Sequence, residues 1–318
     1  MPTRRLQRSE LAVPATSDNF IPKAVSSNAD AIFLDLEDAV APNLKDKARE
    51  MAIRFLNEIK WGNKQMAVRV NSLGTAWAHR DIIEVVSRCP RLDLILLPKA
   101  ESAFDVQFVD QLISGLGQEH PRPRPVGIEV LVETARGLAY AEEIAASSGR
   151  LEAMIFGLGD YSIDMRTYDR AVGRPSPRYS VDGPGGNAIN DQWHFALARI
   201  ANACRANGLR PIDGPYADFG NSEGYFASAV RAAALGFEGK WAIHPSQIDI
   251  ANEVFTPAAS DVNWAKDVIA ALRASNEQGS GAIAIDGVLL DMAHVKMGNT
   301  ILERAKFIED SATVGRGG

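Results

Sequence analysis

The fold is decided by residues 125–161, which read PVGIEVLVETARGLAYAEEIAASSGRLEAMIFGLGDY. An apolar run ends at Glu133, a helical pattern follows, and a second apolar run, AMIFGLG, ends just before Asp160. Asp160 follows Glu133 by 27 positions, which is enough for one right-handed crossover between neighbouring parallel strands. Both carboxylates are therefore expected to leave the sheet at the same edge.

Two carboxylates at one sheet edge have two interpretations. Oxygen ligands converging where α/β proteins usually bind ligands suggest a hard divalent cation, most naturally Mg²⁺. Alternatively, Glu133 and Asp160 each cap the helix that follows. The pair by itself does not choose between a metal site and two helix caps.

Eight short apolar runs alternate with helical patterns along most of the chain. The runs are Glu10–Pro14, Ala31–Leu36, Met66–Val70, Leu94–Lys99, Val126–Glu133, Ala153–Gly159, Leu209–Pro215 and Gly239–Pro245. This period predicts an α/β fold, a (β/α)₈ TIM barrel with its active groups at the carboxyl ends of the strands. A doubly wound open sheet is the alternative. Residues 170–189, rich in Gly and Pro, are predicted to form a long loop without regular structure.

The chain divides into a barrel domain, residues 1–257, and a C-terminal extension, residues 258–318. The extension is predicted to contain a helix over 260–278, a hairpin over 282–290 around Asp286-Gly287, and a final helix that starts between Asp291 and His294. Because the extension has little apolar surface, it must pack on the barrel or on a neighbouring subunit.

Composition excludes several classes of protein. The net charge of −6 argues against a general nucleic-acid binder, and no apolar run is long enough to span a membrane. The first residues have too short an apolar core for a signal peptide. The two cysteines form no ligand cluster and no disulfide framework, which favours a reducing, cytoplasmic location.

Charged residues also gather at the ends of other strands. Asp35, Glu37 and Asp38 crowd the end of the second run. Arg69 lies inside the third run, where a buried arginine is costly unless it is paired. It is therefore either a structural ion-pair partner or an anion-binding group at the barrel mouth. Lys99, at the end of the fourth run, is expected to be a strand-end cation.

Several motifs, in order, resemble one family. They are LDLEDAVAPNLKDKAR (34–49), VRVN (68–71), LPKAES (97–102), VETARG (132–137), FGLGDY (156–161) and AIHPSQI (242–248). Together they resemble the HpcH/HpaI aldolase and citrate lyase β-subunit superfamily over residues 8–308. Within it, DGPYADF (213–219), ANEVFTP (251–257) and DGVLLDMAHVK (286–296) are most similar to the L-malyl-CoA/β-methylmalyl-CoA lyases.

The resemblance implies a (β/α)₈ barrel whose C-terminal helical lid docks on the neighbouring subunit of a homotrimer, or of a hexamer built from trimers. It implies Mg²⁺, with Mn²⁺ as a substitute, held by Glu133 and Asp160. It also implies that Arg69 holds the substrate carboxylate and oxygen. Glu37 and Asp38 correspond to the acidic residues around metal-bound water.

Asp291 corresponds to the acid/base residue that the lid presents in trans. A carboxylate buried under a closed lid can have a raised pKa, which suits proton transfer. The alternative is that Asp291 is the N-cap of the final helix, and the two roles can coexist.

Coenzyme A binding is where the sequence departs from the family. The usual P-G-S turn, followed by a basic residue, reads Pro14-Ala15-Thr16 here. Lys23 remains at the family's lysine position, so Lys23 or Arg8 is expected to supply more of the phosphate grip. His244 is expected either near the CoA adenine or as a satisfied structural residue.

The implied activity is reversible Claisen-type cleavage of L-malyl-CoA or β-methylmalyl-CoA to glyoxylate and acetyl-CoA or propionyl-CoA. Two alternatives use the same residues. One is a malyl-CoA thioesterase, and the other is a citramalyl-CoA lyase that forms pyruvate in place of glyoxylate.

Overall fold

The computed structural model describes residues 3–168, 170, 172–183, 186–189, 191–277, 281–285 and 287–314. The chain forms two compact units, Met1–Glu253 and Val254–Gly318. Each unit is described separately below.

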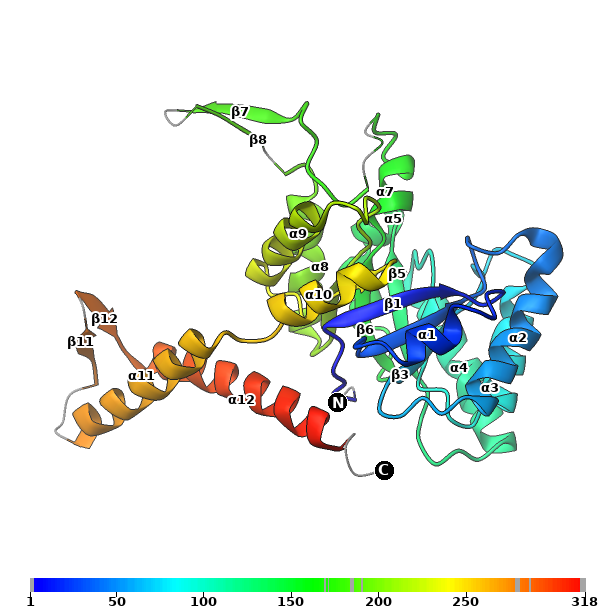
Figure 1. The fold of residues 1–318 in the computed structure, drawn as a ribbon, viewed down its shortest axis with the longest axis horizontal. Coiled ribbons are helices and arrows are strands. Elements are labelled where there is room, and N and C mark those ends of the chain that lie inside the picture. The colour runs from blue at the N-terminus through cyan, green and yellow to red at the C-terminus, as the bar shows by residue number, and fades with distance from the viewer. Residues whose placement is uncertain are drawn as a thin grey trace. The chain divides into compact units, whose positions relative to one another are not determined.

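The first unit is a closed barrel of eight parallel strands (Figure 1). Around the barrel the strands are β1 (Ser9–Pro14), β2 (Ala31–Asp35), β3 (Gln65–Arg69), β4 (Leu94–Leu97), β5 (Gly127–Val132), β6 (Leu151–Phe156), β9 (Arg210–Asp213) and β10 (Gly239–Ala242). Pairing of β1 with β10 closes the ring. The predicted (β/α)₈ barrel is therefore confirmed, and the doubly wound alternative is wrong.

Helices lie between successive strands on the outside of the ring (Figure 1). They are α1 (Ile21–Val25), α2 (Lys45–Glu58), α3 (Ala78–Arg88), α4 (Ala103–Glu119), α5 (Ala135–Ala139), α6 (Ala141–Ala145), α7 (Leu158–Asp164), α8 (His194–Ala206), α9 (Ser222–Ala234) and α10 (Ile248–Val254). Two 3₁₀ turns, Pro42–Leu44 and Pro245–Gln247, precede α2 and α10.

The strands form because continuous apolar runs can be buried on both faces of a parallel sheet. Every residue of β2, β4, β5 and β6 is buried. Side chains that point inward fill the barrel, among them Phe33, Leu96, Leu131, Ile155 and Trp241. The interior is thus a packed core, and the strand ends are left to carry the chemistry.

One prediction about the loops is wrong. Residues 170–189 were expected to lack regular structure, yet β7 (Ser180–Gly183) and β8 (Gly186–Ile189) form a two-stranded antiparallel sheet. Val181 pairs with Ala188, and Gly183 pairs with Gly186. The glycines and prolines read as strand breakers, but two of these glycines are the inner pair of a hairpin.

The second unit contains α11 (Ala259–Glu277), a hairpin of β11 (Ile283–Ile285) and β12 (Val288–Leu290), and α12 (Met292–Val314). The predicted hairpin is confirmed. Gly287 has a φ of +79°, a conformation that glycine adopts readily; Asp286 lies outside the described residues. Val268, Leu272 and Leu290 form the small core of this unit. Among the described residues, no helix is long and apolar enough to cross a membrane.

Candidate active site

The two predicted metal ligands lie at the same rim of the barrel. Glu133 directly follows β5, and Asp160 lies in the first turn of α7, which follows β6. The two strands are parallel neighbours, with Val132 opposite Phe156 at their carboxyl ends. Glu133 is 3% exposed, whereas the Asp160 side chain is 30% exposed. One carboxylate is therefore buried at the rim and the other reaches solvent.

Lys99 contacts both carboxylates. Its backbone N–H donates to Glu133 Oε1 at 2.8 Å, and its Nζ lies 2.9 Å from Asp160 Oδ2. The same Nζ donates to Glu37 Oε1 at 2.6 Å. The sequence placed Lys99 correctly at a strand end but gave no sign of this bridging position. One residue therefore fixes three acidic side chains from three different β/α units.

Arg69, at the end of β3, is held by carboxylates on one side. Its Nε and Nη2 each donate to an Asp35 oxygen at 2.7 Å, and Nη1 lies 3.3 Å from Glu37 Oε2. Although burial alone would lower it, these acidic neighbours raise the pKa of Arg69, so the guanidinium stays charged. Of the two alternatives that the sequence left open, the structure shows the ion pair, and anion binding by Arg69 at the barrel mouth stays a prediction.

The electrostatics of the rim favour an added cation. Burial, with repulsion from Glu37 and Asp160, raises the pKa of Glu133 to about 8. Burial also raises the pKa of Glu37, even though Arg69 and Lys99 are close to it. Burial, together with the neighbouring carboxylates, thus disfavours the charged forms beyond what the two basic side chains compensate.

Glycine backbone makes room for the Glu133 carboxylate. A Cβ on Gly157 would lie 2.4 Å from Glu133 Cβ and 2.5 Å from Oε2. Behind it, a Cβ on Gly214 would meet the Phe156 carbonyl oxygen at 2.0 Å. The turns after β6 and β9 therefore pack on each other and on Glu133 at distances that only glycine allows.

The helix-cap interpretation fails for Glu133. The N-cap of α5 is Thr134, whose hydroxyl accepts from the Gly137 N–H at 2.9 Å. Asp160 lies in the first turn of α7, where a negative charge suits the helix dipole. The Glu133 carboxylate therefore does not cap α5. Asp160 lies in the first turn of its helix and at the same rim as Glu133.

These residues fit a magnesium ion. Carboxylate oxygens are its preferred protein ligands, and it commonly takes one or two of them while keeping waters and substrate. Among the described residues, no group of three or more His, Cys, Asp or Glu side chains could hold a metal ion. A site at this rim would therefore be built from Glu133 and Asp160 with non-protein ligands.

The remaining predicted residues divide by location. Asp38 is near the cluster, with Oδ2 3.9 Å from Lys99 Nζ and a side chain 59% exposed. Lys23 is exposed on α1, which follows the carboxyl end of β1. His244 follows β10 and stacks on Phe219, with ring centroids 4.8 Å apart and planes at 18°. All three lie on segments that follow strand ends at the carboxyl rim.

Arg8 is the predicted residue that the structure does not bring to this rim. It precedes β1, and its side chain forms a double hydrogen bond with Asp30, with Nε–Oδ2 and Nη2–Oδ1 both 2.8 Å. Asp30 thus occupies the Arg8 side chain at the amino end of β1, and a role for Arg8 in holding CoA phosphates stays a prediction. The Arg8 guanidinium stabilises the amino end of the barrel through this ion pair with Asp30.

Asp291 precedes α12 in the second unit and acts as a cap. The Ala293 N–H donates to its Oδ1 at 2.9 Å, and His294 Nδ1 lies 3.0 Å from the same oxygen. The hydrogen bond from His294 lowers the pKa of Asp291, whose side chain is 56% exposed. A raised pKa was expected for Asp291 buried under a closed lid. In the exposed position seen here, the pKa of Asp291 is lowered instead.

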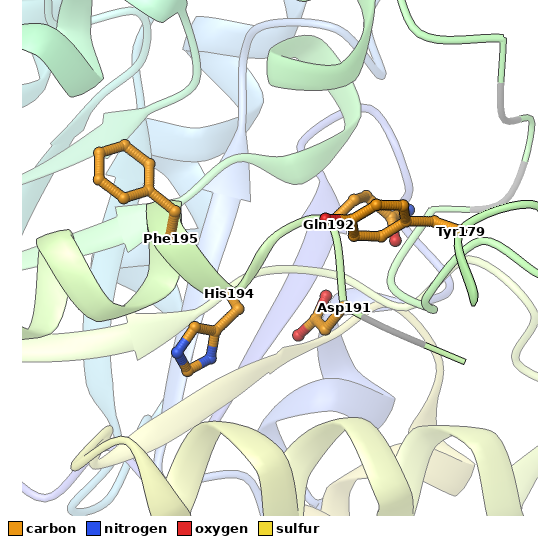
Figure 2. Close-up of a pocket in the computed structure, with 5 residues that line it drawn as sticks. All are labelled: Tyr179, Asp191, Gln192, His194 and Phe195. Carbon is orange, nitrogen blue, oxygen red and sulfur yellow. The ribbon is translucent and has the colours of Figure 1, made fainter. Parts of the chain in front are cut away.

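A separate hollow of about 310 Å³ lies beside the start of α8. Its lining residues are Tyr179, Asp191, Gln192, His194 and Phe195 (Figure 2). In Figure 2 Phe195 and His194 point away from Tyr179 and Gln192, so the side chains do not converge on one point. It shares no residue with the carboxylate cluster at the rim.

The family model for HpcH/HpaI aldolase/citrate lyase matches residues 8–245. The chain belongs to this family. An L-malyl-CoA/beta-methylmalyl-CoA lyase of Cereibacter sphaeroides is 41% identical over 308 residues, which cover 96% of this chain and 97% of that protein. A (3S)-malyl-CoA thioesterase of the same species is 33% identical over 301 residues, which cover 95% of each.

A solved relative is CitE of Mycobacterium tuberculosis in complex with magnesium, acetoacetate and coenzyme A. It is 30% identical and has a TM-score of 0.73, and the match covers 94% of this chain and 97% of that one. The family assignment thus extends over both the sequence and the fold.

Proposed function

We propose that the protein is a Mg²⁺-dependent acyl-CoA lyase that cleaves L-malyl-CoA and β-methylmalyl-CoA reversibly. The products are glyoxylate and acetyl-CoA or propionyl-CoA. The observation that carries the proposal is the rim cluster, in which Lys99 joins Glu133 to Asp160 and Arg69 lies beside Glu37. The relatives named as lyases are more similar to this chain than the thioesterase is.

Glu133 and Asp160 would hold the metal. A bound Mg²⁺ supplies Lewis-acid polarisation of the substrate oxygens and a template for the 2-oxo acid. Mn²⁺, which accepts similar oxygen ligands, would substitute for it. Glu37 and Asp38 would order water around this site, and Lys99 would hold Glu37 and Asp160 in place.

Arg69 would bind the carboxylate of the 2-oxo acid and steady negative charge on its oxygen. A guanidinium suits this because its planar donors match two oxygens at once and it stays charged at any working pH. Asp35 takes one edge of the guanidinium, so the fixed plane presents its other donors. Fixed donors of this kind stabilise developing charge without reorganisation.

Cleavage breaks the bond between the hydroxyl-bearing carbon and the methylene carbon next to the thioester. The hydroxyl proton passes to water at the rim, the bond's electron pair passes to the thioester as an enolate, and the enolate carbon then takes a proton. Asp291 of a neighbouring subunit is the proposed proton donor, and in condensation the same carboxylate removes the methyl proton. Burial on closing would reverse the present lowering of its pKa.

Proton donation by Asp291 to a neighbouring subunit requires an oligomer. We propose a homotrimer or a hexamer of trimers, in which residues 258–318 form the lid over a neighbour. Lys23 and the stacked pair of His244 and Phe219 are the proposed contacts for the CoA phosphates and adenine. Cys89 and Cys204 are both buried thiols without a disulfide, which suits the cytoplasm that we propose as the location.

Product analysis with L-malyl-CoA, with and without Mg²⁺, tests the proposal. Glyoxylate and acetyl-CoA released together, and only with metal, support the lyase. Malate and free CoA would show a thioesterase instead. Cleavage of citramalyl-CoA to pyruvate at a higher kcat/KM than malyl-CoA would overturn the choice of substrate.

A further inference from the structure

The guanidinium of Arg69 lies over two aromatic rings inside the barrel. Its Cζ is 5.7 Å from the ring centroid of Phe33 and 5.7 Å from that of Trp241. The two rings contact each other, with centroids 4.5 Å apart and planes tilted by 39°. A guanidinium within about 6 Å of a ring centroid is attracted to the face of the ring. We call Phe33 and Trp241 the aromatic floor.

The floor is itself fixed from the amino end of the barrel. The indole N–H of Trp241 donates to Glu10 Oε2 at 2.7 Å, and Gln7 Nε2 donates to the same oxygen at 3.0 Å. Glu10 is fully buried on β1, opposite Trp241 on β10. Rotation of the buried indole would take its N–H away from this acceptor, and losing the partner of a buried donor costs free energy.

The two sets of contacts on Arg69 constrain different motions. Asp35 takes two donors in the guanidinium plane and fixes one edge; a tilt of the plane about that edge would change the 3.3 Å contact between Nη1 and Glu37 Oε2. Rings beneath the face oppose this tilt, because the attraction is lost when the cation leaves them. Asp35 at the edge and the two rings at the face therefore together fix the direction of the remaining N–H donors of Arg69.

We propose that Trp241, held by Glu10, is a positioning residue that fixes the plane of Arg69 through the aromatic floor. The expected effect on catalysis rests on the proposed function, because in that function Arg69 binds the 2-oxo acid. In this proposal Trp241 acts only through Arg69. Loosening the floor should weaken the grip on the 2-oxo acid and leave the metal site, which is built from β5 and α7, unchanged.

Fluorinated tryptophan placed at position 241 alone tests this without changing the shape of the core. Fluorine withdraws electron density from the ring, so each added fluorine atom makes the potential at the ring face less negative. KM for glyoxylate in the condensation direction should rise stepwise, to about tenfold with the most fluorinated ring. The Mg²⁺ dissociation constant, measured by calorimetry, should stay within about twofold of the wild type. A flat KM series would overturn the proposal.

A matched pair of substitutions gives the same contrast by another route. Trp241→Phe and Trp241→Leu both remove the hydrogen bond to Glu10, but only the Leu variant lacks a ring face. The Phe variant should keep a lower KM for glyoxylate than the Leu variant. Equal KM values in folded variants would assign Trp241 to core packing alone.

The last readout does not depend on turnover. The Nε–H resonance of Arg69 in nitrogen-15 spectra, assigned by its loss in Arg69→Lys, should move with each fluorine added at position 241. An unmoved resonance would overturn the positioning role, even in a protein with full lyase activity. A moving resonance in a protein that forms no glyoxylate would keep the floor and reject the proposed function.

Discussion

Lys99 has a backbone conformation that few lysines adopt. Its φ of +52° lies in the left-handed region, where a side chain costs about 1–3 kcal/mol unless the surroundings require it. Here the conformation lets the backbone N–H face Glu133 while the ammonium reaches Glu37 and Asp160. The sequence showed a basic residue at a strand end, but a dihedral angle is not visible in sequence.

Gly157 offers a test of the crowded site around Glu133. In Gly157→Ala the new Cβ would lie within 2.5 Å of the Glu133 side chain, so the carboxylate must move. We expect Mg²⁺ to bind about 10–100-fold more weakly, as when an outer partner of a metal ligand is lost. Calorimetric titration with Mg²⁺ measures this directly.

Gly159→Ala is the matched control. It is two positions away, and a Cβ there would meet nothing within 4 Å. Its Mg²⁺ affinity should equal that of the wild type. Equal loss in both alanine variants would mean that the turn after β6, and not the space beside Glu133, determines the affinity.

At the scale of elements, the proposed acid, Asp291, directly precedes α12 and caps it. In Asp291→Asn the amide oxygen can still accept from the Ala293 N–H, because asparagine caps helices as well as aspartate does. The carboxyl proton is lost. Turnover should therefore fall by about a hundredfold or more, with Mg²⁺ and CoA binding kept. Steady-state kinetics and the oligomeric mass, measured together, decide the matter; a dissociated or unfolded variant would favour capping alone.

Strand β10 depends on a buried ion pair. Lys240 Nζ donates to Asp213 Oδ2 at 2.6 Å and to the Gly214 carbonyl at 2.8 Å, and Lys240 is 1% exposed. Lys240→Met leaves Asp213 buried without its partner, which should cost about 3–5 kcal/mol. The thermal midpoint should drop clearly, and the double variant with Asp213→Asn should recover part of the loss. A larger loss in the double variant would contradict this account.

The elements show how far sequence reasoning reaches. The eight strands were predictable because each lies in a short apolar run, and the shared rim of Glu133 and Asp160 because the carboxyl ends of parallel strands meet at one edge of a barrel. The hairpin of β7 and β8 was missed because glycine breaks strands on average, but also sits at tight antiparallel turns. Arg8 was offered as a substitute cation for CoA because of the family departure at the β1 turn, and the sequence could not show that Arg8 pairs with Asp30.

At the scale of the whole molecule, buried glutamates link barrel stability to pH. Glu10 and Glu129 lie inside the barrel, and burial and their mutual repulsion raise the pKa of Glu10. Burial likewise raises the pKa of Glu129, although Arg210 is 3.4 Å away. The folded state therefore binds protons more tightly than the unfolded state, whose glutamates titrate near pH 4.5.

The sign follows from linkage. This contribution to stability is fully present below about pH 4.5 and is lost as the pH rises through the raised folded pKa. Glu10→Gln, which keeps an acceptor for Trp241, removes it. The variant should gain in thermal midpoint relative to the wild type as the pH rises above about 4.5. A constant difference between the two proteins across that range would show that Glu10 does not titrate there.

The central claim is that Glu133 and Asp160 hold the metal on which cleavage depends. The most direct test is a Mg²⁺ titration of glyoxylate release from L-malyl-CoA, run on the wild type, Glu133→Gln and Asp160→Asn. The wild type should show saturable activation. Each variant should lose about a thousandfold or more, since metal stabilisation of developing charge is worth several kcal/mol, and each should keep its fold by circular dichroism. Full metal-dependent activity in either variant would contradict the account.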